Sequence, residues 1–194
     1  NFKIIEDASH ALGSKYNGKL VGNCKYSEIT VFSFHPVKIA TSCEGGMATT
    51  NSATIAKRLT LFREHGIEKD IKKFEIKKNR YPFYYEQQNL GYNYRLSDVH
   101  AALGASQLNR IDLFIKKRNL LRVIYEKSLK KLPIKFQKTG KKNYSSNHLV
   151  IISVEIKIRN KLISFLKKNK ITTNIHYIPI FFHPYHYKKK HLTN

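Results

Sequence analysis

The stretch that decides the fold reads Ser-Phe-His-Pro-Val-Lys at residues 33–38 and continues to Glu-Gly-Gly at residues 44–46. It follows a run rich in apolar residues. A second apolar run, at residues 2–5, leads into Asp7, about thirty residues upstream of Lys38. Short apolar runs bounded by turn residues predict buried strands. We therefore expect a carboxylate and a lysine at the ends of two strands, with a serine hydroxyl between them in the sequence.

These three groups suit an enzyme that uses pyridoxal 5′-phosphate (PLP). Lys38 would form an imine with the aldehyde, Asp7 would keep the pyridine nitrogen protonated, and Ser33 would bind a phosphate oxygen. His10 would lie near the phenolic oxygen of the ring. Once released by the substrate, the lysine would move a proton between Cα and C4′. The alternatives are a surface lysine, a strand-end acid and a structural histidine, but the combination favours the catalytic interpretation.

Two further polar side chains, Asn93 and Arg95, lie between a polar, aromatic loop and the expected start of a helix. A guanidinium group there would bind an anionic ligand through paired hydrogen bonds. A surface salt bridge or a helix cap is an equally good interpretation of these two residues.

The charge of the chain is strongly positive. It has 194 residues and a net charge of +23, from 36 basic and 13 acidic residues. This balance would suit nucleic acid or an acidic membrane surface. However, the lysines are spread over nearly every segment, and a basic surface also favours an anionic substrate such as a nucleotide diphosphate sugar. Charge therefore leaves nucleic acid as an alternative partner and decides little by itself.

The cysteines and histidines predict neither a disulfide framework nor a metal site. Cys24 and Cys43 show no CxxC spacing, and free thiols in a reducing cytoplasm are the expected state. No apolar stretch approaches the roughly 18 residues of a membrane span, so we expect a cytoplasmic protein without a membrane partner. Four histidines near the end of the sequence have none of the familiar zinc spacings: His176, His183, His186 and His191.

The pattern of apolar residues predicts an α/β fold with a mostly parallel sheet. Strands are expected at residues 2–5, 28–34 and 47–50. A helix should begin after Ser52 as its N-cap and end near Gly66. A long loop is then expected, followed by further elements at residues 97–131 (helix), 149–154 (strand), 158–169 (helix) and 172–178 (strand).

The same pattern predicts two domains. Residues 1–130 would form part of a large domain with a long connecting helix, and residues 131–194 an incomplete small α/β domain. Because the chain opens at Asn1 inside a strand-like run and stops after a lysine-rich stretch, we interpret it as a fragment.

Several motifs in a fixed order carry a resemblance to a known family. Beyond residues 33–38, they are Glu-Asp-Ala-Ser-His-Ala-Leu-Gly at 6–13, Glu-Gly-Gly-Met at 44–47, Arg-Glu-His-Gly at 63–66, Gly-Tyr-Asn-Tyr-Arg-Leu at 91–96, Ala-Ala-Leu-Gly at 101–104 and Gln-Leu at 107–108. Together they resemble the DegT/DnrJ/StrS family of sugar aminotransferases, which are PLP enzymes of fold type I. The runs at 145–149 and 175–180 are similar to the branch of that family in pseudaminic acid biosynthesis.

The resemblance implies a role for each cofactor-binding residue. Lys38 would be the Schiff-base lysine, Asp7 the pyridinium partner, His10 a ring contact and Ser33 a phosphate ligand. Asn93 would reach the phosphate of the cofactor bound by the other subunit, since these enzymes share two active sites across a homodimer.

The resemblance also implies the substrates. Arg95, His148 and His176 would lie on the side of a UDP-linked 4-keto-6-deoxy sugar, with an amino acid, glutamate in this family, as amino donor. Ile39 replaces the proline or asparagine expected after the lysine. The family's phosphate loop and ring-stacking residue have no counterpart here, so we expect the isolated chain to bind PLP weakly and to be nearly inactive. An inactive scaffold, or a basic nucleic-acid-binding protein derived from that fold, is the alternative.

Overall fold

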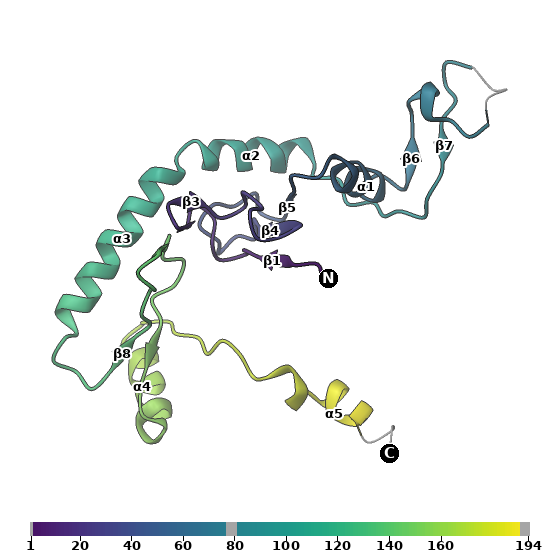
Figure 1. Ribbon diagram of the computed structural model, residues 1–194. Coiled ribbons are helices and arrows are strands. Elements are labelled where there is room, and N and C mark those ends of the chain that lie inside the picture. The colour runs from purple at the N-terminus through teal and green to yellow at the C-terminus, as the bar shows by residue number, and fades with distance from the viewer. Residues whose placement is uncertain (1, 77–80, 191–194) are drawn as a thin grey trace. The chain divides into compact units, whose positions relative to one another are not determined.

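The computed structural model describes residues 2–76 and 81–190, with the side chains described up to residue 187 (Figure 1). The contacts divide the chain into two compact units. One consists of Asn1–Lys131 and Phe136–Ile151, and the other of Leu132–Lys135 and Ile152–Asn194. Each unit is described by itself.

The first unit is built around a three-stranded sheet with the strand order β1-β4-β5. Its strands are β1 (Ile5–Asp7), β4 (Ile29–Ser33) and β5 (Gly46–Thr49). The β1–β4 pair is parallel and the β4–β5 pair is antiparallel. The prediction of a mostly parallel sheet is therefore wrong. Only about a dozen residues without a helix separate β4 from β5, and a parallel return needs a longer crossover.

The predicted strands are present, but the first is displaced. β1 begins at Ile5, where it can pair with Ile29, and the residues before it are not in a strand. Ile5 is 67% exposed and Phe2 is 85% exposed, so the expected burial of this run is also wrong. Within the described part of the chain β1 pairs with β4 alone, so it is an edge strand of this sheet.

A small core lies on one face of the sheet. Phe32 from β4 and Phe34 just beyond it are buried together with Ala8, and three apolar residues pack against them: Ala11, Leu12 and Val21. Because side chains alternate along a strand, Val31 faces the opposite side, where it is 37% exposed. Thr30 is fully buried and donates a hydrogen bond of 3.0 Å to the Glu6 carboxylate, which fastens β4 to β1.

Helix α1 (Ala53–Arg63) follows the prediction closely. The Ser52 hydroxyl accepts a hydrogen bond from the backbone N–H of Ile55 at 3.3 Å, so Ser52 is the N-cap. At the other end, the N–H of Gly66 bonds the carbonyl of Leu61 at 2.7 Å. Gly66 has φ +73°, a conformation that glycine adopts without strain, and this explains the stop.

The segment after α1 is more ordered than the predicted long loop. It contains β6 (Ile67–Glu68), the 3₁₀ turn η1 (Ile71–Lys73) and β7 (Glu86–Gln87), with β6 antiparallel to β7. Part of the predicted loop, residues 77–80, lies outside the described residues. The buried carboxylate of Glu86 accepts hydrogen bonds from the backbone N–H groups of Glu75 at 2.7 Å and Ile76 at 2.8 Å.

We expect Glu86→Gln to loosen this segment. Burial by itself would raise the pKa of Glu86, but hydrogen bonds from Gln88, from the N–H groups of Glu75 and Ile76 and from Tyr84 lower it below the ordinary value. The carboxylate therefore stabilises the fold fully above the unfolded-state pKa, and this stabilisation is lost as the pH falls through the lower folded-state pKa.

A glutamine cannot accept all of these bonds and turns an NH₂ group toward donors. Amide hydrogen exchange at Glu75 and Ile76 should become roughly tenfold faster near neutral pH. Exchange in the wild type should approach that of the variant in acid. The exposed neighbour Glu75 provides the control, as Glu75→Gln should leave exchange at Ile76 unchanged. Equal exchange rates in Glu86→Gln and the wild type would contradict this account.

The predicted helix over residues 97–131 is in fact two helices. α2 (Asp98–Leu108) and α3 (Ile111–Ser128) meet at an angle (Figure 1). Asn109 is the C-cap of α2, and Arg110, with φ −111° and ψ 8°, leaves the helical conformation. Neither proline nor glycine marks this break. Asparagine has low helix propensity, but this preference is too weak to predict a break, because packing often overrides it.

A second sheet and α3 enclose the turn after β1. β2 (Lys15–Tyr16) pairs antiparallel with β3 (Lys19–Leu20) and with β9 (Asn143–Tyr144), although β9 comes far later in the sequence. Gly13 lies against Ile115, the buried residue of α3. A Cβ at Gly13 would collide with the Ile115 side chain, and its φ of +75° also favours glycine.

The second unit contains short elements and few half-buried side chains. They are β10 (Ile152–Ser153), α4 (Ile156–Lys168), η2 (Ile180–Phe182) and α5 (Pro184–Lys190), together with Lys135 of β8 (Lys135–Phe136). α4 matches the predicted helix, and the predicted strand at 149–154 shrinks to β10, which pairs with β8. The strand predicted at 172–178 is absent, because a strand requires a pairing partner that this segment does not have in the described chain. No helix among the described residues is long and apolar enough to cross a membrane.

Candidate active site

Asp7 and Ser33 lie at the carboxyl-terminal ends of two neighbouring strands. Asp7 is the last residue of β1 and Ser33 the last of β4, and the two strands run parallel with Asp7 opposite Val31. Adjacent strands lie about 4.8 Å apart, and Ser33 stands two residues beyond the partner of Asp7. A carboxylate and a hydroxyl therefore lie at the carboxyl ends of neighbouring strands, where ligands of α/β sheets bind.

Asp7 is held in its ionised form. Its Oδ1 accepts hydrogen bonds from the Ser9 hydroxyl at 2.6 Å and from the Ser9 backbone N–H at 3.0 Å. These bonds lower the pKa of Asp7 below its ordinary value, against the effect of desolvation, and the charges of His10 and Lys38 lower it further. An ionised carboxylate of this kind can accept a hydrogen bond from a protonated pyridine nitrogen.

Lys38 lies in a tight turn beyond β4. Its backbone N–H bonds the carbonyl of His35 at 2.9 Å, and its half-buried side chain precedes two buried residues, Ile39 and Ala40. Phe34 fixes this loop from both sides: its N–H bonds the Gly45 carbonyl at 2.9 Å, and its carbonyl accepts from the N–H of Ser42 at 3.0 Å. The glycine pair in the Glu-Gly-Gly motif thus closes the loop that carries the lysine.

The side chains of Ser33 and His10 have partners close by. The Ser33 hydroxyl accepts a weak hydrogen bond of 3.4 Å from the N–H of His35, which leaves its own proton for another acceptor. The His10 ring packs against the ring of His148, with the centroids 4.4 Å apart and the planes inclined by 58°. The structure therefore brings His148 to the part of the chain that carries Asp7 and His10.

Asn93 and Arg95 are exposed and are attached to the end of α1. Asn93 forms an isolated bridge with Glu64, and the charge of Arg95 is one of the influences that lower the pKa of Glu64, after those of Arg63 and Lys69. These described contacts do not join them to Asp7 or Lys38. His176 belongs to the second unit, where it is exposed and stacks on Tyr177 with centroids 4.4 Å apart.

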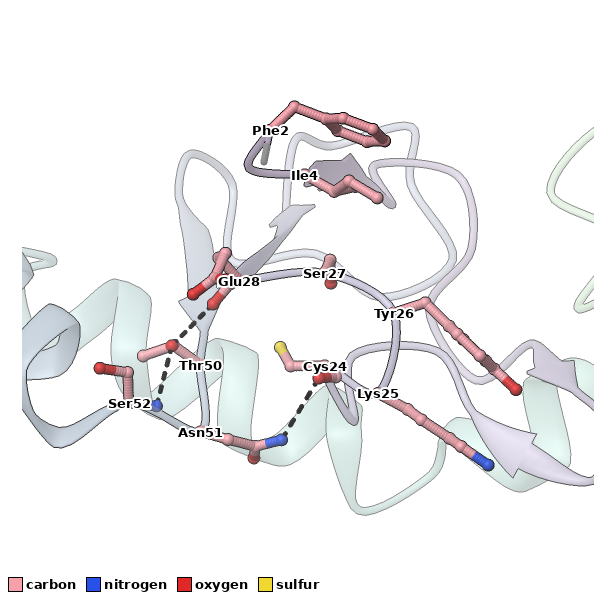
Figure 2. A pocket seen from close by; sticks show the side chains of 10 residues that line it. All are labelled: Phe2, Ile4, Cys24, Lys25, Tyr26, Ser27, Glu28, Thr50, Asn51 and Ser52. Atoms are coloured by element: carbon pink, nitrogen blue, oxygen red, sulfur yellow. Dashed lines mark hydrogen bonds between the residues drawn. The ribbon is translucent and has the colours of Figure 1, made fainter.

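A pocket of about 520 Å³ opens elsewhere on the first unit (Figure 2). Its ten lining residues include Phe2 and Ile4 before β1, Glu28 before β4 and Thr50 after β5. The pocket thus lies at the opposite strand ends from Asp7 and Ser33. For that reason we do not assign it to the cofactor.

Two residues outside the sequence motifs, Asn119 and Ser14, help to hold the turn before His148. Asn119 of α3 bonds the turn before His148, and the hydroxyl groups of Ser14 and Ser146 lie 2.8 Å apart. The two serines are 132 residues apart in the sequence, so no local spacing could have shown the contact. Among the described residues, no group of three or more His, Cys, Asp or Glu side chains could hold a metal ion, and His191 lies outside them.

The model of the DegT/DnrJ/EryC1/StrS aminotransferase family matches residues 1–194. The chain belongs to this family. Its members are PLP-dependent sugar aminotransferases. The α/β fold and the order of the motifs therefore agree with the expected family.

Two curated relatives in the family are 37% identical to the chain. One is the uncharacterised protein MJ1066 of Methanocaldococcus jannaschii, which matches 95% of the chain and 48% of its own length. The other is the UDP-4-amino-4,6-dideoxy-N-acetyl-β-L-altrosamine transaminase of Campylobacter jejuni, which matches 93% of the chain and 46% of its own length. The chain spans about half the length of the curated relatives that it matches.

Solved structures of family members have the same fold over the matched part. Helicobacter pylori PseC, an aminotransferase involved in the biosynthesis of pseudoaminic acid, has a TM-score of 0.84 at 32% identity and covers 95% of the chain and 47% of its own. Spr1654 of Streptococcus pneumoniae, named as a sugar aminotransferase and solved in its PLP-form, has a TM-score of 0.82 at 28% identity. The match covers 97% of the chain and 47% of Spr1654. The same protein has also been solved in a PMP-form.

Proposed function

We propose that this chain carries the lysine-bearing part of a PLP-dependent enzyme that transfers an amino group from glutamate to a UDP-linked 4-keto-6-deoxy sugar. One observation carries the proposal. Ser33 and the ionised Asp7 lie at the carboxyl-terminal ends of two adjacent parallel strands. The positive charge of Lys38 contributes to the lowered pKa of Asp7. The family supports the reaction class, and the names of the altrosamine transaminases support the choice of sugar.

Each residue near this sheet edge has a defined task. Asp7 would accept a hydrogen bond from the protonated pyridine nitrogen, and Ser33, whose hydroxyl proton is not used by the His35 bond, would donate to a phosphate oxygen. The Lys38 amine would bind the aldehyde carbon of the cofactor and, once released, would carry a proton between two carbon atoms. When bound, PLP supplies a ring that withdraws electrons from the substrate carbon. These residue types fit that group, since each has a complementary atom to hold.

The substrate side involves residues that the structure does not gather into one place. We propose that Arg95, His148 and His176 contact the sugar nucleotide, and that Asn93 contacts the cofactor phosphate in the partner subunit of a homodimer. The net charge of +23 supports an anionic substrate, because positive surfaces attract nucleotide phosphates. A cytoplasmic location agrees with such a substrate.

We further propose that the isolated chain turns over slowly or not at all. It spans about half the length of its relatives, and the sheet exposes apolar side chains, with Ile5 at 67% and Met47 at 49% exposure. Large apolar surfaces of this kind are usually covered in the working protein. Polypeptide that covers them would also supply cofactor contacts that are missing here.

A chimera tests the proposed function. This chain replaces the matching part of the Campylobacter jejuni transaminase, and the purified chimera receives PLP, glutamate and a UDP-linked 4-keto-6-deoxy sugar. We expect formation of 2-oxoglutarate and the amino sugar at a rate at least about 10²-fold above that of the isolated chain. A folded chimera without turnover would contradict the proposal. Equal turnover by the isolated chain would contradict only the need for further polypeptide.

The alternative function, nucleic-acid binding by an inactive scaffold, is favoured by one observation, the net charge of +23. It predicts DNA or RNA binding with an affinity that falls steeply as the salt concentration rises. A gel-shift titration over a range of salt concentrations measures this directly. Tight, strongly salt-dependent binding together with an inactive chimera would favour the scaffold over the enzyme.

A further inference from the structure

Two neighbouring residues of α3 hold the turn that precedes His148. The Asn119 side chain donates hydrogen bonds to the carbonyls of Ile115 at 3.0 Å and Ser145 at 3.2 Å, and accepts one from the Asn147 side chain at 3.0 Å. The guanidinium group of Arg118 donates to the carbonyl of His148 at 3.0 Å. Asn119 thus satisfies groups on both the helix and the turn.

The same turn is fastened on its other side to the segment after β1. Ser146 is fully buried, and its backbone N–H donates to the Ser14 hydroxyl at 3.1 Å, while the two hydroxyl groups lie 2.8 Å apart. The segment that ends in Ser14 begins at Ala8, and its successive turns are closed by the bonds Ala11 N–H to Ala8 and Ser14 N–H to Ala11, both 2.9 Å. The turn is therefore anchored between α3 and the segment that contains His10.

The conformation of the turn depends on these anchors. Asn147 has φ +50°, in the left-handed region that asparagine tolerates better than most residues but that still carries some strain. Its hydrogen bond to Asn119 stabilises that conformation. The next residue, His148, can then place its ring 4.4 Å from that of His10, whose charge acts on Asp7.

We propose that Asn119 is a positioning residue for the reaction: it fixes the turn at residues 145–148 so that the His148 ring rests on His10, three residues from Asp7. This inference rests on the proposed function, in which His148 contacts the sugar nucleotide. The hydrogen bonds of Asn119 go to α3 and to this turn. Asn119 acts through His148, by holding the turn that carries this histidine.

The first test needs no turnover. In the wild-type chain, ring protons of His10 and His148 should show a nuclear Overhauser contact, because the ring centroids are 4.4 Å apart. Asn119→Ala and Asn119→Asp should both lose it. The aspartate has the same size as asparagine but turns an acceptor toward the carbonyls of Ile115 and Ser145.

A matched control is available at the C-cap of α4. The Asn169 side chain donates to the carbonyl of Phe165 at 2.9 Å, the same four-residue spacing as Asn119 and Ile115. Asn169→Ala should keep the His10–His148 contact. A contact that persists in both Asn119 variants would overturn the inference. So would global unfolding of both variants by circular dichroism, since Asn119 would then support the whole fold and not one ring pair.

The second test uses the chimera. Asn119→Ala should raise the KM for the sugar nucleotide roughly tenfold, the loss of about one hydrogen bond, with kcat within about twofold of the parent. The KM for glutamate should not change. A fall in kcat with an unchanged KM would overturn the positioning role. If the parent chimera shows no turnover, the proposed function fails, while the ring contact still decides the role of Asn119 in orienting His148.

Discussion

Lys38→Ala should abolish turnover by the chimera, with a loss of at least about 10³-fold in the rate of amino-group transfer. Alanine has no amine to bind the aldehyde carbon or to carry the proton between two carbon atoms. The measurement is the initial rate of 2-oxoglutarate formation at saturating glutamate and sugar nucleotide.

The control for this variant is a lysine without an expected role. Lys116 is an exposed residue of α3, and Lys116→Ala should turn over as fast as the parent chimera. Added methylamine should restore part of the activity of Lys38→Ala, because a free amine can replace the missing base. Undiminished turnover by Lys38→Ala would show that another residue holds the cofactor.

Asp7→Asn should lower kcat/KM by about 10²- to 10³-fold, as expected for removal of one charge that stabilises the reacting state. The amide oxygen can still accept the bonds from Ser9, so the local fold should survive. What disappears is the negative charge that keeps the pyridine nitrogen protonated. The rate is measured in the chimera over a range of glutamate concentrations.

Glu6 provides the matched control for Asp7. Glu6→Gln removes the same charge one residue earlier, on the opposite face of β1, and the glutamine oxygen can still accept the bond from Thr30. Its kcat/KM should stay within about threefold of the parent, a change typical of a remote surface charge. Equal losses in the two variants would mean that Asp7 acts only through general charge and not as the partner of the ring.

The parts of the fold that could be predicted were those with local signals. The apolar run of β4, the N-cap Ser52 and the glycine at the end of α1 each depend on a few neighbouring residues. Asp7 and Ser33 also lie at strand ends, within two residues of the ends that the apolar runs predicted. Their assembly at one edge required only that the two strands be adjacent and parallel.

Other features of the fold were predicted wrongly or not at all, because they depend on distant partners or have no strong local signal. β5 turns back because the connecting segment is short, and the strand expected at 172–178 has nothing to pair with in the described chain. The break at Asn109 has no strong breaker residue to announce it. The turn before His148 is anchored by the contact between Ser14 and Ser146, which are 132 residues apart in the sequence. No local pattern could therefore have predicted that the His148 ring packs against His10.

The most direct test of the central claim is a map of where PLP attaches to the wild-type chain. The chain is incubated with limiting PLP, reduced with borohydride, digested and analysed by peptide mass spectrometry. We predict that the phosphopyridoxyl group is found mainly on the peptide containing Lys38, and that Asp7→Asn weakens this preference. A label spread evenly over the many exposed lysines, with no excess at Lys38, would contradict the account.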